Sequence, residues 1–97
     1  MSYYLITYDL LSQNKDYKGF YAAIRRIGME YFHPLETVWV VKMRNDGEKS
    51  SADISNNLRQ YIDDKTDRLL VVQVSNQDID GWLGKNFWQW IRNFKMT

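Results

Sequence analysis

A short apolar and aromatic run near the N-terminus, Tyr3–Asp9, most constrains what this chain can fold into. Tyrosine, leucine, isoleucine and threonine favour a pleated strand, and the run ends abruptly in a carboxylate. Tyr4, Ile6 and Tyr8 would share one face of the strand, and the other face is also mostly apolar. This pattern predicts a central strand in a sheet that is covered on both sides. Asp9 would then lie at the rim of the sheet, where a carboxylate needs water, a hydrogen-bond donor or a metal.

The rest of the chain alternates between helical and strand patterns. These patterns first predict a helix that ends at Gly28, a short edge strand at 29–33 and a turn at Pro34–Glu36. They then predict a second central strand at 37–41, a helix that opens with a capping box at Ser50 and Asp53, and a last strand at 69–74. Two strand–helix–strand units with right-handed crossovers predict an α+β fold, the ferredoxin-like βαββαβ sandwich. Both helices would then cover one face of the sheet.

The C-terminal part of the chain is unusually aromatic. We expect a single domain over residues 1–97, with a core at about 1–75 and an aromatic C-terminal extension at about 76–97 that forms a short helix or an arm. The sheet face without helices would carry a large apolar set, which monomers rarely expose. We therefore expect this face to be closed by a second copy of the chain, by the aromatic extension, or by both.

Composition limits the classes of function. The formal net charge is +1, which by itself does not indicate a nucleic-acid-binding protein. A dimer can nevertheless concentrate its positive charge in one groove. There is no cysteine, which excludes disulfides and thiolate metal sites. Neither a leader-like start nor an apolar run of about 18 residues occurs, so we expect a cytoplasmic protein that does not bind membranes.

Several segments together resemble a known protein family. The stretch 3–10, the helix that ends at Gly28 and the strand at 37–41 resemble the small CRISPR-associated protein two group. The closer resemblance is to its stand-alone SinR-like branch, and it is carried by Tyr8–Leu10, Asp16–Tyr17, Ser51–Ile54 and Leu69–Val72.

This resemblance implies a ferredoxin-like fold and a homodimer. In CRISPR members of the group, the carboxylate that ends the first strand is paired across the two-fold axis and holds a divalent metal. Some members are metal-dependent nucleases on RNA or DNA, others are structural adaptors, and related VapD-like toxins cleave RNA. Asp9 is the residue of this sequence that matches the metal-binding position.

Asp9 is accordingly the candidate catalytic and metal-binding residue, with Mg²⁺ or Mn²⁺ as the expected cofactor. One carboxylate holds such an ion weakly, but a symmetric dimer would supply a second Asp9. The alternative is that Asp9 only accepts backbone N–H groups where the chain turns after the strand. The single histidine, His33, is more typical of a structural or solvated position than of a general base.

Candidate phosphate-binding residues are the basic side chains of the first two thirds of the chain, namely Lys15, Lys18, Arg25, Arg26, Lys42 and Arg44. Acidic residues lie between them, so the alternative is an ordinary solvated surface of mixed charge. Trp82, Trp88 and Trp90 could stack on bases of a single strand, but at this density they more often dock onto a sheet or a partner subunit.

Two functional hypotheses follow. The first is a homodimeric, metal-dependent endonuclease or phosphodiesterase that acts on RNA or DNA through paired Asp9 side chains. The second is a non-enzymatic dimer of the same fold, an adaptor or a toxin–antitoxin-type protein, which binds a protein partner and in which Asp9 is structural.

Overall fold

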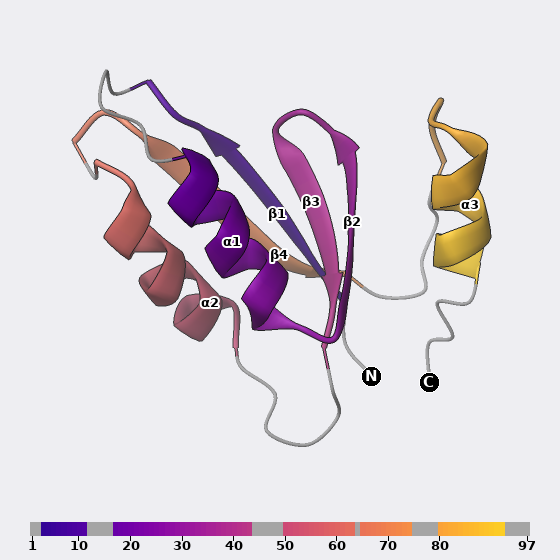
Figure 1. Ribbon diagram of the computed structural model, residues 1–97, viewed down its shortest axis with the longest axis horizontal. Coiled ribbons are helices and arrows are strands. Elements are labelled where there is room, and N and C mark those ends of the chain that lie inside the picture. The colour runs from indigo at the N-terminus through magenta and orange to yellow at the C-terminus, as the bar shows by residue number, and fades with distance from the viewer. Residues whose placement is uncertain (1–2, 12–16, 44–49, 64, 75–79, 93–97) are drawn as a thin grey trace.

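The computed structural model describes residues 3–11, 17–43, 50–63, 65–74 and 80–92. Its elements are β1 (Tyr3–Asp9), α1 (Tyr17–Ile27), β2 (Glu30–Leu35), β3 (Val38–Lys42), α2 (Ser51–Leu58), the short 3-10 turn η1 (Arg59–Tyr61), β4 (Arg68–Val74) and α3 (Lys85–Arg92). The protein is α+β, with the sheet between α1 and α2 on one side and α3 on the other (Figure 1). The predicted order of the six core elements is confirmed. None of the helices in these ranges has the length and apolarity needed to cross a membrane.

The four strands form an antiparallel sheet in the order β2-β3-β1-β4, so β1 and β3 are central, as their apolar runs predict. Opposed residues of neighbouring strands share a face of the sheet. Leu5 lies opposite Val40 of β3 and Val72 of β4, and Asp9 lies opposite Arg68. We call the face covered by α1 and α2 the helix face; on β1 it consists of Tyr4, Ile6 and Tyr8. The other face, which on β1 consists of Tyr3, Leu5, Thr7 and Asp9, is the open face.

The main core lies between the helix face and the two helices. It is made of twelve buried residues, Tyr4, Ile6, Tyr8, Leu10, Phe20, Ala23, Ile24, Trp39, Val41, Met43, Ile54 and Leu58. The predicted capping box at the start of α2 is confirmed, because the Asp53 N–H donates to the Ser50 hydroxyl at 3.1 Å and the Ser50 N–H donates to the Asp53 carboxylate at 3.0 Å. This cap fixes where α2 begins and lets Ile54 and Leu58 point together into the core.

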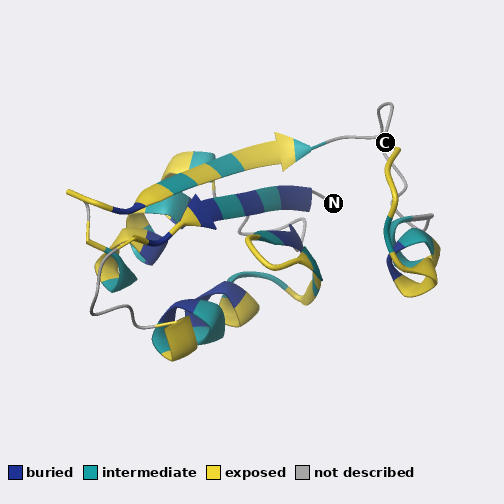
Figure 2. Ribbon diagram, turned by 90° about the horizontal axis from the view of Figure 1, so that it is seen from above, coloured by how far each residue is buried: buried dark blue, intermediate teal, exposed yellow. Residues whose placement is uncertain are grey.

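The aromatic extension forms α3, which packs on one end of the open face. Phe87 is buried in a second cluster with Tyr3 and Val40. Trp90 contacts the Tyr3 ring edge-on at a centroid distance of 5.7 Å, and its indole N–H donates to Glu30 at 2.9 Å. The other end of this face stays uncovered, since Leu70 is 57% exposed and Val72 is 40% exposed. In Figure 2, β4 alternates between exposed and intermediate residues, whereas β1 is mostly buried.

One sequence prediction about local structure is wrong in detail. The turn predicted at Pro34–Glu36 begins later, because β2 continues through Leu35 with a register shift between Phe32 and Leu35. Proline has no N–H to donate, and an irregular edge strand tolerates this. Gly28 follows the end of α1, as predicted, and its role is to allow close approach of the chain to β3. A Cβ atom there would lie 2.4 Å from the Lys42 carbonyl oxygen, while the next N–H, that of Met29, donates to the same oxygen at 2.9 Å.

Candidate functional site

Asp9 ends β1 on the open face, and its side chain is exposed. Within the described ranges, its carboxylate takes part in no hydrogen bond or ion pair. The strand ends here at an open hollow of about 240 Å³, which is lined by Thr7, Tyr8, Asp9, Arg68, Leu69 and Leu70. The alternative that Asp9 accepts backbone N–H groups where the chain turns concerns the segment after β1, of which residues 12–16 lie outside the described residues. Among the described residues, no side chain or backbone group occupies the Asp9 carboxylate.

Arg68 faces Asp9 from the first position of β4. Its guanidinium donates from Nη1 to the Asp67 carbonyl oxygen at 3.0 Å. No ion pair joins Arg68 to Asp9, although the two residues are Cα partners in the sheet. Among its described lining residues, the hollow thus carries one acid and one base, which form no ion pair with each other.

Asp67 is a buried carboxylate that supports this end of the sheet. It is only 4% exposed, and it accepts the Leu11 N–H at 2.7 Å and the Asp63 N–H at 2.8 Å. A carboxylate that accepts backbone N–H groups in a buried site forms strong, charge-assisted hydrogen bonds. Through these bonds Asp67 joins the segment after β1 to the loop before β4, so it fixes Asp9 and Arg68 relative to each other.

The helix face beside the site carries an aromatic cluster. The Tyr8 hydroxyl donates to the Glu36 carbonyl oxygen at 2.8 Å and accepts the Trp39 indole N–H at 3.3 Å. Burial, followed by a hydrogen bond shared with the Tyr21 hydroxyl at 3.0 Å, raises the pKa of Tyr8 above its ordinary value. Tyr8 therefore stays protonated and acts as a structural group.

His33 belongs to this cluster and not to the Asp9 site. Its ring stacks on Trp39 with centroids 4.0 Å apart, and its Nε2 lies 3.0 Å from the Glu36 carbonyl oxygen. The carbonyl can only accept, so Nε2 carries the proton in this contact. His33 lies on the helix face, opposite to the face that bears Asp9, which agrees with the structural interpretation from the sequence.

The predicted phosphate-binding residues that the structure describes are not gathered around Asp9. Lys15 and Arg44 lie outside the described residues. Lys18, Arg25 and Arg26 are exposed on α1, across the sheet from the open face, and the Arg25 guanidinium lies 6.0 Å from the centre of the Trp39 ring. Lys42 pairs with Tyr3 at the opposite end of the sheet, roughly 20 Å along the strand from Asp9, and its Nζ lies 3.7 Å from Glu30.

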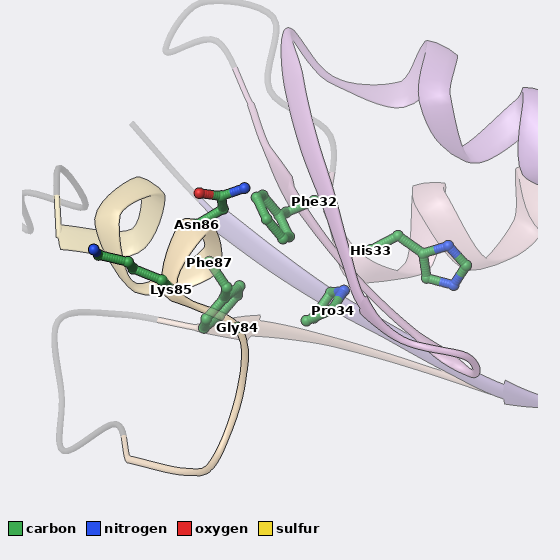
Figure 3. Close-up of a pocket in the computed structure, with 7 residues that line it drawn as sticks. All are labelled: Phe32, His33, Pro34, Gly84, Lys85, Asn86 and Phe87. Carbon is green, nitrogen blue, oxygen red and sulfur yellow. The ribbon is translucent and has the colours of Figure 1, made fainter.

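The aromatic extension docks onto the sheet, as its composition favours. A second hollow, of about 340 Å³, lies between α3 and β2 and is lined by Phe32, His33, Pro34, Gly84, Lys85, Asn86 and Phe87. Figure 3 shows Phe32, Pro34 and Phe87 around this hollow, whereas the side chains of His33 and Lys85 extend away from it. The hollow is therefore mostly apolar. Among the described large hydrophobic side chains of the extension, Trp82 is the exposed one, with 99% of its surface accessible.

Asp9 is the one carboxylate among the described residues that line the hollow, so a divalent metal there would need further oxygen ligands. The described residues contain no group of three or more histidine, aspartate or glutamate side chains that could hold a metal ion. Mg²⁺ is commonly held by one or two carboxylates together with water and phosphate oxygens. One protomer offers the Asp9 carboxylate and the Thr7 hydroxyl at the hollow, and two protomers would offer two carboxylates.

Sequence reasoning missed Arg68 and Asp67. For Arg68 a signal existed, since an antiparallel last strand beside the first places its first residue opposite Asp9. For Asp67 no local signal exists, because its burial depends on Leu11, which is 56 positions away in the sequence.

Comparison of the chain with protein-family models, with curated proteins and with solved structures finds no match.

Proposed function

We propose that the sheet, α1 and α2 form a ferredoxin-like sandwich and that two copies of the chain associate through the open face. The element order and the antiparallel sheet with central β1 and β3 support the fold. The uncovered Leu70 and Val72 support the association, because contiguous apolar surface on one face is typical of an interface. A two-fold axis through this face would bring the two Asp9 side chains toward each other.

In this proposal the dimer is a metal-dependent phosphodiesterase on RNA or DNA. The observation that carries it is the placement of Asp9, an exposed carboxylate without a described partner at the end of a central strand and on the associating face. Two such carboxylates repel each other and favour a shared cation. Mg²⁺ or Mn²⁺ at this position would polarise the scissile phosphate and lower the pKa of a bound water. Hydrolysis adds the water hydroxyl to phosphorus, breaks one P–O ester bond and transfers a proton to the leaving sugar oxygen.

The test is cleavage of labelled single- and double-stranded RNA and DNA in Mg²⁺, in Mn²⁺ and in EDTA. Wild type should cleave at least one substrate with metal, and Asp9→Asn should reduce the rate at least about 100-fold while the thermal midpoint stays unchanged. Asp80→Asn is the matched control, since Asp80 is exposed before α3 and accepts only the adjacent Gly81 N–H at 2.7 Å in the described chain. Equal cleavage by wild type and Asp9→Asn would indicate a contaminant and reject the proposal.

A second candidate is a non-enzymatic dimer that binds a protein partner. One observation favours it: Arg68 stands opposite Asp9, and a nearby positive charge opposes cation binding at that carboxylate. This candidate predicts that Asp9→Asn leaves dimer affinity and thermal midpoint nearly unchanged and that wild type cleaves no nucleic acid. Metal-dependent turnover that disappears with Asp9 would exclude it.

A further inference from the structure

We infer that Arg68 is the phosphate-contacting residue of the Asp9 site and that its ligand is a phosphodiester group of a nucleic-acid strand. The inference rests on the proposed function for the nature of the ligand and on the described geometry for the choice of residue. Arg68 lies opposite Asp9 in the sheet, and both side chains line the same open hollow of about 240 Å³ together with Thr7. Of the cations expected from the sequence, the four that the structure describes, Lys18, Arg25, Arg26 and Lys42, do not line this hollow.

The guanidinium of Arg68 forms a hydrogen bond through one of its nitrogens and has other N–H groups accessible to a ligand. Its Nη1 donates to the Asp67 carbonyl oxygen at 3.0 Å, and the side chain is exposed. A guanidinium has five N–H donors in a planar fork, so one such bond orients the group and leaves other donors for phosphate oxygens. No described carboxylate lies within ion-pair distance of Arg68, so the described structure contains no acid that competes with a phosphate.

The backbone beneath Arg68 is fixed, which makes it a pre-positioned contact and not merely a surface charge. The neighbouring Asp67 carboxylate is buried and accepts two backbone N–H groups, those of Leu11 and Asp63. Leu11 follows Asp9 by two positions, so the same carboxylate ties the end of β1 to the start of β4. Preorganised donors stabilise developing charge better than mobile ones, because they need no reorganisation when the ligand reacts.

A cation at this place meets a need of the proposed chemistry. Asp9 alone would repel a phosphodiester, and the described chain places Arg68 where it can offset this repulsion. During phosphoryl transfer negative charge spreads over the non-bridging oxygens, and arginine stabilises it with two parallel N–H donors. Arg68 therefore strengthens binding of the phosphodiester even when no metal is present, whereas Asp9 is required for its cleavage.

The experiment measures binding of fluorescein-labelled single-stranded RNA and DNA by fluorescence anisotropy in EDTA, where cleavage does not occur. Arg68→Gln should weaken binding about ten-fold and reduce the slope of log Kd against log salt concentration by about one. Arg68→Lys should keep the salt slope, because the charge remains. Lys65→Gln is the matched control, since it removes one exposed positive charge three positions away, outside the hollow. Far-UV circular dichroism of each variant verifies the fold.

The outcomes separate this inference from the proposed function. Weaker binding by Arg68→Gln than by Lys65→Gln supports the inference, whether or not wild type cleaves. If wild type cleaves but Arg68→Gln binds like the control, the proposed function stands and the inference is overturned. Absence of detectable binding of wild type to either probe also overturns it.

Discussion

At the scale of single residues, the two faces of β1 have different roles: one face packs in the core and the other presents Asp9 to solvent. Tyr8 points to the helix face and is enclosed by the Glu36 carbonyl oxygen, Trp39 and Tyr21, whereas Asp9, one position later, is exposed on the open face. Because side chains alternate along a strand, a shift of one position would exchange these environments. The buried hydroxyl network around Tyr8 therefore fixes the register that presents Asp9.

Alkaline pH should unfold the protein partly through Tyr8. Burial raises the pKa of Tyr8, so the folded protein keeps this proton after the unfolded chain releases it near pH 10. The stability that Tyr8 contributes is therefore complete below about pH 10 and is lost as the pH rises further, by up to about 1.4 kcal/mol per pH unit. Urea unfolding between pH 8 and 11 measures this slope.

Tyr8→Phe is the variant that isolates the effect. It should lower the free energy of unfolding at pH 7 by about 1–3 kcal/mol, because the partner groups lose their hydrogen bonds, and it should also flatten the slope above pH 10. Tyr3 also has a raised pKa, caused by burial and then by Glu30, so part of the slope should remain. An unchanged slope in Tyr8→Phe would show that Tyr8 titrates alike in both states.

At the scale of helices and strands, local sequence patterns predicted most of the helices and strands, but few of the contacts between segments that are distant in the sequence. The capping box at Ser50 and Asp53 placed the start of α2, since its hydrogen bonds lie within four residues. The strand end at Leu35 was missed, because Pro34 is a strong turn signal that an irregular edge strand overrides. Asp9 was placed correctly from the end of an apolar run, whereas Arg68 and Asp67 required strand pairing and a contact between distant segments.

Helix α3 should undock as a unit when its anchor is removed. Phe87 is the one buried residue among positions 85–91, the part of α3 whose side chains are described, and Phe87→Ala removes its contacts with Tyr3 and Val40. We expect a loss of stability below the roughly 3–5 kcal/mol of a fully buried phenylalanine, because α3 can leave while the sheet stays folded. Hydrogen exchange of residues 85–92 should accelerate, while β1 and β3 remain protected.

The matched control for α3 is Trp82→Ala. Trp82 is 99% exposed, so its removal should change stability by less than about 0.5 kcal/mol and leave exchange in α3 as in wild type. If Phe87→Ala also leaves this exchange unchanged, Phe87 is not what holds the helix on the sheet.

At the scale of the whole molecule, α3 covers only one end of the open face. The end near Asp9 keeps Leu70 and Val72 exposed. A second copy placed there would bury apolar surface and bring the Asp9 hollows together, so the proposed association and the proposed site depend on the same surface.

A charge placed on this surface should therefore separate the proposed dimer. Leu70→Lys should convert a dimer to a monomer in sedimentation equilibrium at micromolar concentration, because an interface does not bury an unpaired lysine without a large cost. Gln60→Lys is the matched control, since it adds the same charge at an exposed position of η1, on the side of the helices. Equal masses for wild type and Leu70→Lys would place any interface elsewhere.

The two outer strands of the sheet also differ in how readily a further strand can pair with them. Strand β4 pairs with β1 without interruption from Arg68 to Val74, whereas β2, on the other border, is irregular and contains Pro34. A regular border can template a further strand, and a proline at the opposite border hinders such addition. Edge-to-edge pairing through the β4 borders of two molecules would thus end with a closed pair, because the β2 border with Pro34 hinders the addition of a further strand.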